Sequence, residues 1–313
     1  MRIVLALGGN ALLERGQPLT AVNQRNNIKK AAKAIATIAQ EHQVVIVHGN
    51  GPQVGLLIEQ NSEYQKNNPA VTAYPMDVLG AETCGMIGYM LQQELYNADR
   101  TLNITSMLTQ TCVDIDDPAF DDPTKFVGPV YSDEEVKQQS LNNPSAIYKK
   151  DGDYFRRVVS SPRPTDIIES TQIEHLLESG NTVIACGGGG IPVFKGDNGI
   201  LVGVECVIDK DLTAELLAEQ IRADLFIILT DGAVYLNYGQ ENQQAIQCTT
   251  PGELANYHFP AGSMGPKIDA VCQFVSQGLG DAAIGALDEL EAVIAGESGT
   301  RITQGEGMTF YSS

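Results

Sequence analysis

Residues 3–12 read IVLALGGNAL, an apolar run that is followed by two glycines. The five apolar residues from Ile3 to Leu7 predict a strand that is buried on both faces, as in a parallel sheet. The two glycines that follow permit positive φ angles and place no Cβ between the backbone and a bound group. Exposed N–H groups in such a turn can bind an anion. Taken alone, the stretch fits an ordinary strand-to-helix turn equally well.

The same pattern of a buried strand followed by glycines occurs twice more. Residues 44–47 (VVIV) precede HGNGP at 48–52, and residues 182–186 (TVIAC) precede four glycines at 187–190. In a parallel sheet with helical crossovers, the carboxyl ends of the strands meet at one edge, where ligands bind. Three such turns therefore predict an anion site that is lined by backbone N–H groups.

The composition restricts the class of protein. The chain has 313 residues, 43% of them hydrophobic, which is enough for a large core in one domain or two lobes. A net charge of −19 argues against binding to nucleic acid or to an anionic membrane. The six cysteines include no CxxC pair, and neither a signal peptide nor a transmembrane run is recognisable. We expect a cytoplasmic protein without disulfides.

Strands and helices alternate along most of the chain, which predicts a three-layer α/β/α sandwich around a mainly parallel central sheet. Residues 114–164 interrupt the alternation with prolines, aspartates and short apolar runs. We expect an inserted, protruding subdomain of turns and short strands that acts as a lid. A lobe boundary is placed near residue 205. Helices are expected over 20–41, 53–65, 76–96, 166–179, 210–221 and 262–277, and strands over 103–113, 225–229, 234–236 and 282–287.

The common nucleotide motifs are absent. No Walker A loop or protein-kinase signature occurs, and the glycines of residues 49–55 miss the Rossmann spacing by one position. No Ser-His-Asp or HExxH arrangement stands out among the four histidines. The candidate site therefore consists of glycine turns and a few lysines.

Three lysines lie next to predicted turns. Lys210 stands between Asp209 and Asp211, where a strand is expected to meet a helix. Lys267 opens another helix, where a cation opposes the helix dipole unless an anion neutralises both. Lys125 lies in the insert. Each could be a solvated charge, and either aspartate could simply cap its helix. Together, in an acidic chain, the lysines favour a clamp for a phosphoryl group.

Five motifs then identify a resemblance to a known family. They are GGNAL at 8–12, HGNGPQVG at 48–55, GGGGIP at 187–192, VIDKD at 207–211 and GSMGPK at 262–267. In this order they resemble the carbamate kinases, a branch of the amino-acid kinase superfamily, nearly from end to end. The resemblance implies that superfamily's fold and a homodimer. It also implies reversible phosphoryl transfer between ATP and carbamate with Mg²⁺, making ATP from carbamoyl phosphate in arginine or allantoin breakdown.

The resemblance also implies roles for individual residues. Lys210 and Lys267 would hold the transferring phosphoryl group, Asp211 would organise these lysines, and Lys125 would reach in from the insert. Residues 1–205 would bind the acceptor and residues 206–313 the nucleotide. The residues expected around carbamate and the phosphoryl group are Gly8, Gly9, Asn10, Gly49, Asn50, Gly51, Gly188 and Gly189. Those expected around the nucleotide are Thr230, Asp231, Tyr235, Met264 and Gly265. No direct metal ligand from the protein is predicted.

Some stretches depart from the family pattern, and two alternatives stay open. The departures are KFVG at 125–128, VSSP at 159–162 and DGA at 231–233, which affect the lid and the nucleotide contacts. One alternative is a superfamily kinase acting on another acceptor, such as acetylglutamate or UMP. The other is a non-catalytic nucleotide sensor, which the presence of both Lys210 and Lys267 disfavours.

Overall fold

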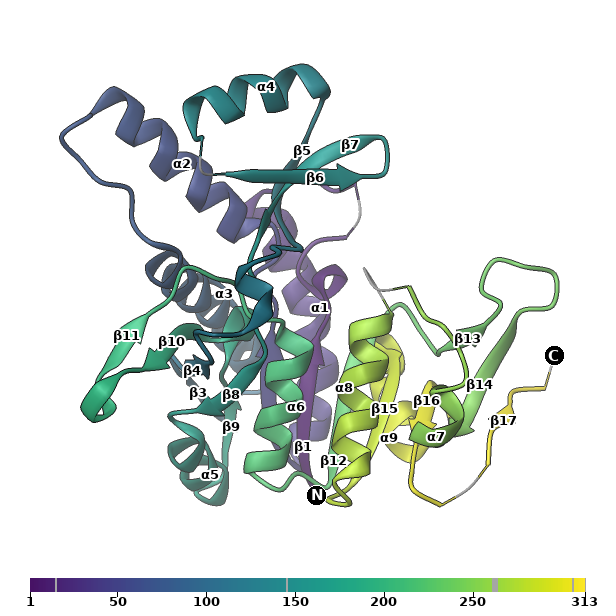
Figure 1. The fold of residues 1–313 in the computed structure, drawn as a ribbon. Coiled ribbons are helices and arrows are strands. Elements are labelled where there is room, and N and C mark those ends of the chain that lie inside the picture. The colour runs from purple at the N-terminus through teal and green to yellow at the C-terminus, as the bar shows by residue number, and fades with distance from the viewer. Residues whose placement is uncertain (15, 145, 261–263, 306, 313) are drawn as a thin grey trace.

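The computed structural model describes residues 1–14, 16–144, 146–260, 264–305 and 307–312 (Figure 1). A central sheet runs through the molecule in the strand order β13-β14-β16-β15-β12-β1-β2-β9-β3, with β17 paired to β14. Its strands are β1 (Arg2–Leu7), β2 (Gln43–His48), β3 (Asn103–Ser106), β9 (Asn181–Ile184), β12 (Leu225–Thr230), β13 (Tyr235–Leu236), β14 (Gln244–Thr249), β15 (Asp281–Ala286), β16 (Thr300–Ile302) and β17 (Thr309–Phe310).

Helices cover both faces of this sheet, so the predicted three-layer sandwich is confirmed. The alternating side chains of β1 explain the layers: Ile3, Leu5 and Leu7 pack on one side, and Val4 and Ala6 on the other. The first side carries α1 (Ala21–Ala39), α3 (Met76–Ala98) and α9 (Leu290–Ala295). The second carries α5 (Ser170–Glu178), α6 (Lys210–Gln220), α7 (Pro251–Leu254) and α8 (Gly265–Ser276).

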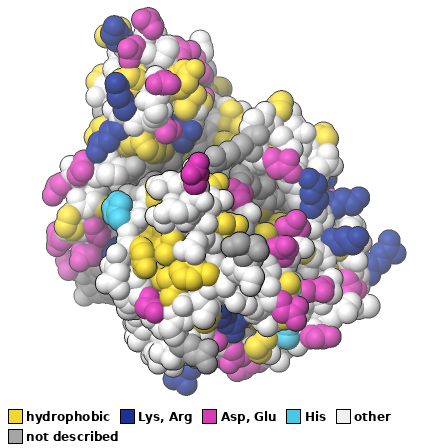
Figure 2. Space-filling model, turned by 90° about the vertical axis from the view of Figure 1, so that its right-hand side faces the viewer, with side chains coloured by type: hydrophobic (Ala, Val, Ile, Leu, Met, Phe, Trp, Pro, Cys, Tyr) yellow, Lys and Arg dark blue, Asp and Glu magenta, His cyan; other side chains and the backbone are white. Residues whose placement is uncertain are grey.

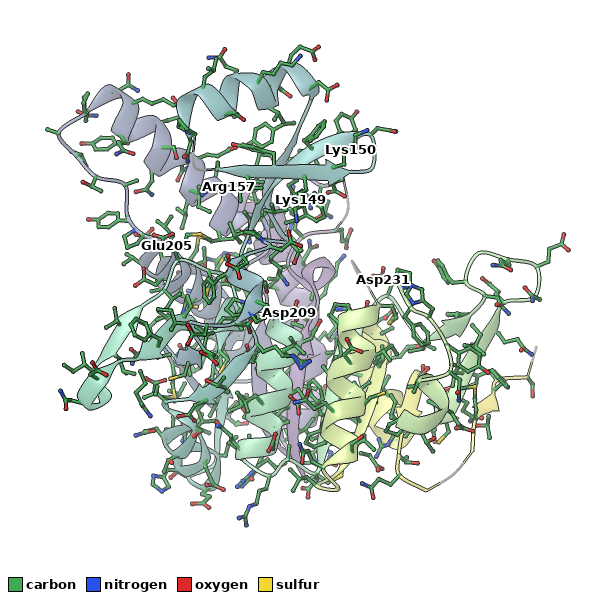
Figure 3. The ribbon with its side chains drawn as sticks, in the orientation of Figure 1. Lys149, Lys150, Arg157, Glu205, Asp209 and Asp231 are labelled. Carbon is green, nitrogen blue, oxygen red and sulfur yellow. The ribbon has the colours of Figure 1, made fainter. Side chains whose placement is uncertain are left out.

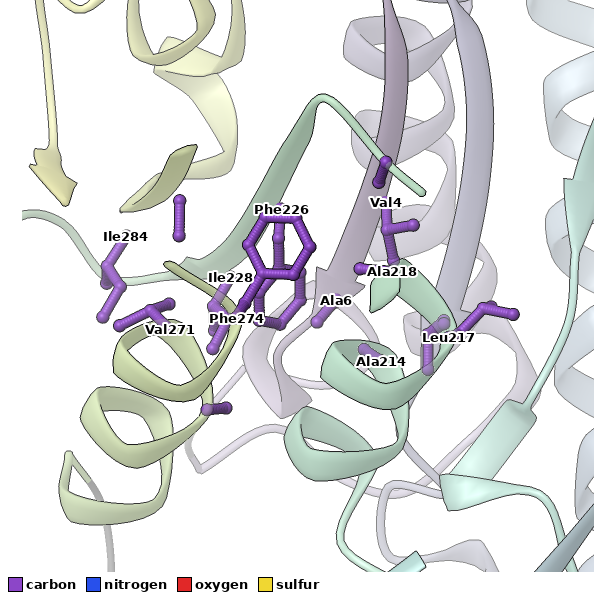
Figure 4. Packing of buried hydrophobic residues seen from close by; sticks show 14 of the residues in the cluster. Val4, Ala6, Ala214, Leu217, Ala218, Phe226, Ile228, Val271, Phe274 and Ile284 are labelled. Atoms are coloured by element: carbon purple, nitrogen blue, oxygen red, sulfur yellow. The ribbon is translucent and has the colours of Figure 1, made fainter. Parts of the chain in front are cut away.

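The second side of the core is tightly packed around two phenylalanines (Figure 4). The rings of Phe226 on β12 and Phe274 on α8 meet edge to face, with 5.8 Å between their centroids, and both are fully buried. Ala214 and Ala218 bring α6 close to Val4 on the sheet. Small residues on α6 thus let α6 and α8 lie side by side over the central strands.

Strand register places the three glycine turns at one edge. β1, β2 and β9 are neighbours and parallel, and Leu7 pairs with His48 while Ile46 pairs with Ile184. The strands therefore end at nearly the same level, as the sequence predicted. The helices α6 and α8 also begin at this edge (Figure 1).

The insert forms a small antiparallel sheet above that edge, next to α2 (Gln53–Asn67) (Figure 1). Gly55 of α2 lies so close to Gly128 that a Cβ on Gly55 would sit 2.0 Å from the Gly128 Cα. Val127 packs in one cluster with residues of α2, and the Tyr131 hydroxyl donates to Glu59. The insert is therefore attached to α2. Its elements are η2 (Pro118–Phe120), β5 (Lys125–Tyr131), α4 (Asp133–Asn142), β6 (Ile147–Asp151) and β7 (Tyr154–Val159).

A second sheet of order β11-β10-β4-β8 flanks the site, and here one prediction is wrong. The single strand expected over 103–113 is divided between β3 and β4, which belong to different sheets. The backbone between them is bonded to both neighbours, because the Met107 N–H donates to Ile184 and the Thr109 carbonyl accepts from Ile191. The strands of this sheet are β4 (Gln110–Val113), β8 (Pro164–Ile167), β10 (Ile191–Lys195) and β11 (Leu201–Gly203), and the remaining short helices are η1 (Gly9–Ala11), η3 (Gly187–Gly189), η4 (Asp197–Gly199) and η5 (Leu287–Glu289).

Two further expectations need correction. The insert contains the helix α4 as well as turns and strands, and a capping box between Ser132 and Glu135 starts it. The strand expected directly before Lys210 ends at Gly203, and the chain then reaches α6 as an irregular segment that is held by single backbone bonds, such as that from the Val207 N–H to the Ser160 carbonyl. Within the described residues, no helix is long and apolar enough to cross a membrane. The cytoplasmic location stays a prediction.

Candidate active site

The glycine turns pack directly against neighbouring backbone. The Gly8 N–H donates to the Leu229 carbonyl at 3.0 Å, and a Cβ on Gly8 would lie 2.6 Å from that oxygen. Gly189 adopts φ +93°, and a Cβ on it would lie 2.4 Å from the carbonyl oxygen of Ile208. Only glycine fits at these two positions. The turn after β1 is thereby bonded to the end of β12, and the turn after β9 lies against the segment that leads into α6.

The turn after β2 contacts both a catalytic candidate and another turn. A Cβ on Gly49 would lie 3.4 Å from Cδ of Lys210. A Cβ on Gly188 would lie 1.6 Å from Oδ1 of Asn50, so the Asn50 amide lies on the Gly188 backbone. Gly51 adopts φ +56°. The side chain of Asn10, which was predicted to lie here, is outside the described part of the structure.

Asp211 joins the two lysines that open α6 and α8. Its Oδ1 accepts from Nζ of Lys210 at 2.5 Å, and its Oδ2 accepts from Nζ of Lys267 at 2.7 Å. The Asp211 side chain is 4% exposed, and those of Lys210 and Lys267 are 13% and 17% exposed. The structure therefore brings these three predicted residues into one nearly buried cluster.

Asp209 connects this cluster to the insert. Its Oδ1 caps α6 by accepting from the Asp211 N–H at 2.8 Å, and its Oδ2 accepts from Nζ of Lys125. Asp209 was predicted only as a possible helix cap, so its second role was missed. An aspartate on each side of Lys210 was the available signal. Figure 3 shows Asp209 at the end of α6 that faces Arg157 and Lys149 of the insert.

The pKa shifts follow from burial and these contacts. Burial acts to raise the pKa of Asp211, but Lys210 and Lys267 outweigh it and hold the pKa below its usual value. The pKa of Asp209 is likewise low, because Lys125 and Lys210 outweigh its burial. The pKa of Lys210 is raised, since Asp211 and Asp209 more than offset burial. Burial and the charge of Lys210 lower the pKa of Lys267.

The cluster is suited to an anion. Three lysines and two aspartates sum to one positive charge, in a chain whose net charge is −19. Burial and the neighbouring charge of Lys210 disfavour the charged form of Lys267 and lower its pKa. An incoming anion would stabilise that charge, and the positive ends of the two helix dipoles add to its attraction. The arrangement can hold a phosphoryl group but contains no nucleophile–base pair.

The predicted nucleotide residues lie at the end of β12, in β13 and at the start of α8. Thr230 ends β12, Asp231 follows it, and Tyr235 opens β13, where its ring meets Tyr238 edge to face. Figure 3 shows Asp231 on the loop that follows β12, near the start of α8. Met264 and Gly265 begin that helix, and the Gly265 N–H donates to the Pro260 carbonyl at 2.9 Å. Gly262 and Ser263 of the same motif lie outside the described residues.

Three buried side chains behind the turns were missed by the sequence analysis. His48 is 1% exposed, and its ring lies so close to Gly187 that a Cβ there would sit 2.5 Å away. Burial lowers the pKa of His48 to about 4, so the imidazole is neutral at neutral pH. Thr83 and Cys84 of α3 contact Asn50 and Gly187. In the sequence, these buried contacts were indicated by one feature, the histidine at the end of β2.

A hollow of about 670 Å³ at the opposite, amino edge of the sheet is not the candidate site. Its lining includes Arg2 and Asp224, whose polar groups are already bonded to the chain: the Arg2 N–H donates to Asp224, and the Arg2 guanidinium donates to Glu174. It contains none of the predicted site residues. The candidate site is therefore the cluster at the carboxyl edge and not this hollow.

Comparisons with known proteins agree with this geometry. Residues 1–284 match the model of the amino acid kinase family. The carbamate kinases of Haemophilus influenzae and Rhizobium meliloti are 50% and 52% identical over 100% and 97% of this chain and 100% and 93% of their own. The structure of Giardia lamblia carbamate kinase bound to AMP-PNP is 36% identical, covers 97% of this chain and 98% of its own, and has a TM-score of 0.88. The chain belongs to the amino acid kinase family, in its carbamate kinase branch.

Proposed function

We propose that the protein is a carbamate kinase, which transfers a phosphoryl group reversibly between ATP and carbamate to give ADP and carbamoyl phosphate. The observation that carries the proposal is the bonding of Lys210 and Lys267 to one buried carboxylate, Asp211, beside the glycine turns. The family membership agrees with it. The direction we expect is ATP synthesis from carbamoyl phosphate.

The residues present are sufficient for this chemistry. Carbamate is already an anion, so its attack on phosphorus needs no general base. Phosphoryl transfer depends mainly on positioning and on stabilising charge over the transferred oxygens. Lys210 and Lys267 supply that charge, and Asp211 keeps the two ammonium groups at fixed positions. N–H groups of the turns after β1 and β2 hold the acceptor, while the N–H of Gly8 itself stays bonded to Leu229.

The nucleotide lies over the carboxyl end of β12 and the start of α8, within residues 206–313. Thr230, Asp231 and Tyr235 line its base and ribose side, and Met264 and Gly265 lie by its phosphates. Among the described residues, no three acidic, histidine or cysteine side chains gather to hold a metal ion. The two carboxylates of the cleft, Asp209 and Asp211, are engaged by lysines. We expect Mg²⁺ to bind together with the nucleotide, as MgADP or MgATP.

The insert closes the cleft over the acceptor. Residues 1–205 form the acceptor lobe, and residues 114–164 stand above it as the subdomain seen at the top of Figure 2, with Lys and Arg side chains along its flank. The ion pair between Lys125 and Asp209 already bridges the insert and α6. When substrate is bound, Lys125 contributes a third positive charge to the phosphoryl group.

A second copy of the chain covers the outer face of α3. Val78, Met86, Tyr89 and Tyr96 are exposed and recur on one side of this helix. Tyr89 and Tyr96 are each more than half exposed, an arrangement suited to a self-complementary interface. Sedimentation should give a dimer for the natural chain and a monomer for Tyr89→Glu. A monomeric natural chain would refute the homodimer.

The test of the function is the reaction with matched variants. Lys210→Ala and Lys267→Ala should each lower turnover by roughly 10²–10³, as for removal of one preorganised charge. Lys137→Ala, an exposed lysine of α4, is the control and should keep normal turnover. Acetylglutamate and UMP are offered as alternative acceptors with ATP. Faster turnover with either would favour another superfamily kinase, and nucleotide binding without any turnover would favour a sensor.

A further inference from the structure

Two consecutive residues of α3, Thr83 and Cys84, each contact a different glycine turn. Thr83 is fully buried, and its Oγ1 lies 3.2 Å from Oδ1 of Asn50 in the turn after β2. Cys84 is 4% exposed, and its Sγ donates to the Gly187 carbonyl in the turn after β9. We propose that Thr83 is a positioning residue, which orients the Asn50 amide so that its NH₂ group faces the phosphoryl acceptor. The proposal rests on the proposed function.

The Asn50 side chain is confined on two sides. The backbone of Gly188 lies on one side, with a hypothetical Cβ only 1.6 Å from Oδ1 and 2.5 Å from Nδ2. Thr83 lies on another. An amide confined in this way keeps its plane, and the remaining freedom is a flip that exchanges oxygen and nitrogen. The flip decides whether the cleft meets an N–H donor or a carbonyl oxygen.

The hydroxyl of Thr83 can support the orientation in which Oδ1 of Asn50 faces it. A threonine hydroxyl has one proton, and Oγ1 of Thr83 lies near two oxygens, that of Gly80 at 2.8 Å and Oδ1 of Asn50. The Gly80 carbonyl is inside α3 and accepts the N–H of Cys84 as part of the helix. The Gly80 carbonyl, although it is the nearer oxygen, therefore keeps a partner when the hydroxyl proton is donated to Asn50.

An anion in the cleft selects the same orientation. Gly49 packs against the side chain of Lys210, so the turn that carries Asn50 lies next to the phosphoryl clamp. A carbonyl oxygen aimed at carbamate or a phosphoryl group would be repelled, whereas an N–H would donate to it. Thr83 donates to Oδ1 and so stabilises the orientation that presents Nδ2 to the substrate.

The test is Thr83→Val, which keeps the shape of the side chain and removes the hydroxyl. With MgADP, kcat/KM for carbamoyl phosphate should fall about 10- to 100-fold, the range expected when one polar contact is lost. KM for ADP should change less than twofold, because the nucleotide residues lie on other elements. Thr83→Ser keeps the hydroxyl and should recover most of the activity. Thr37→Val is the control for loss of a helical threonine hydroxyl, since Thr37 donates to the Lys33 carbonyl of its own helix α1.

A double variant separates orientation from a structural effect. In an Asn50→Ala background, Thr83→Val should cause no further loss of kcat/KM, because the amide it orients is gone. Melting temperatures are measured for all variants. An equal further loss in that background, or normal kinetics of Thr83→Val, would overturn the proposal. If the natural chain itself makes no ATP, the proposed function fails instead, and the two failures are thereby distinguished.

Discussion

The sharpest prediction concerns the carboxylate that holds both lysines. Asp211→Asn keeps the shape of the side chain and removes the charge that Lys210 and Lys267 share at 2.5 and 2.7 Å. Breaking a buried ion pair from one side costs about 3–5 kcal/mol, because the partner charge stays buried and uncompensated. At ~2.1 cal/mol/K of unfolding entropy per residue, a chain of this length loses roughly 1.5 °C of melting temperature per kcal/mol. The expected loss is therefore about 5–8 °C.

Scanning calorimetry measures this loss, and the control is Asp281→Asn. Asp281 pairs with Arg301 at 3.0 Å but is 41% exposed, so its replacement should cost at most about 1 kcal/mol. The turnover of Asp211→Asn should also fall, since the ammonium groups of Lys210 and Lys267 lose their fixed positions. Inorganic phosphate should restore part of the lost melting temperature by supplying a negative charge to both lysines. A variant as stable as the natural chain would show that Asp211 does not balance these charges.

Two further predictions concern the insert and a buried acid. Lys125→Ala should lower kcat, whereas calorimetric titration should find the affinity for ADP nearly unchanged, because Lys125 acts on the closed cleft. Lys137→Ala is the control. Unchanged kinetics of Lys125→Ala would show that the insert has no catalytic role. Glu215 of α6 is 2% exposed and accepts from Gln273, and burial and Glu219 raise its pKa to about 7. Folding favours the neutral form of Glu215. Its contribution to the free energy of unfolding is therefore fully present below about pH 4.5 and is lost as the pH rises through 7. Glu215→Gln should therefore melt increasingly above the natural chain between pH 5 and 8, and parallel melting curves would contradict the shift.

The fold was predictable because its main signals are local. Each of the runs at 3–7, 44–47 and 182–184 is long enough and apolar enough to specify a strand buried on both faces. The rule that ligands bind at the carboxyl edge then places three turns together without any knowledge of the strand order. The cluster of Lys210, Asp211 and Lys267 follows from the same rule, since α6 and α8 start at that edge.

The rest depended on tertiary structure. No glycine or proline separates β3 from β4, so the break between Ser106 and Gln110 is set by pairing with β9 and β10, which a single-strand pattern does not contain. The contact of Lys125 with Asp209 joins residues 84 positions apart. Thr83 looks like any small residue on the packed side of a helix. The start of α4 was legible, because Ser132 and Glu135 have the spacing of a capping box.

Synthesis of ATP by the purified protein decides whether the proposed reaction takes place. The purified protein is mixed with MgADP and fresh carbamoyl phosphate, and ATP is followed with luciferase, beside a protein-free mixture and the Lys267→Ala variant. We expect rapid ATP formation by the natural chain, roughly 10²–10³-fold slower formation by the variant, and none above background without protein. Folded natural protein that makes no more ATP than the protein-free mixture would contradict the proposed function.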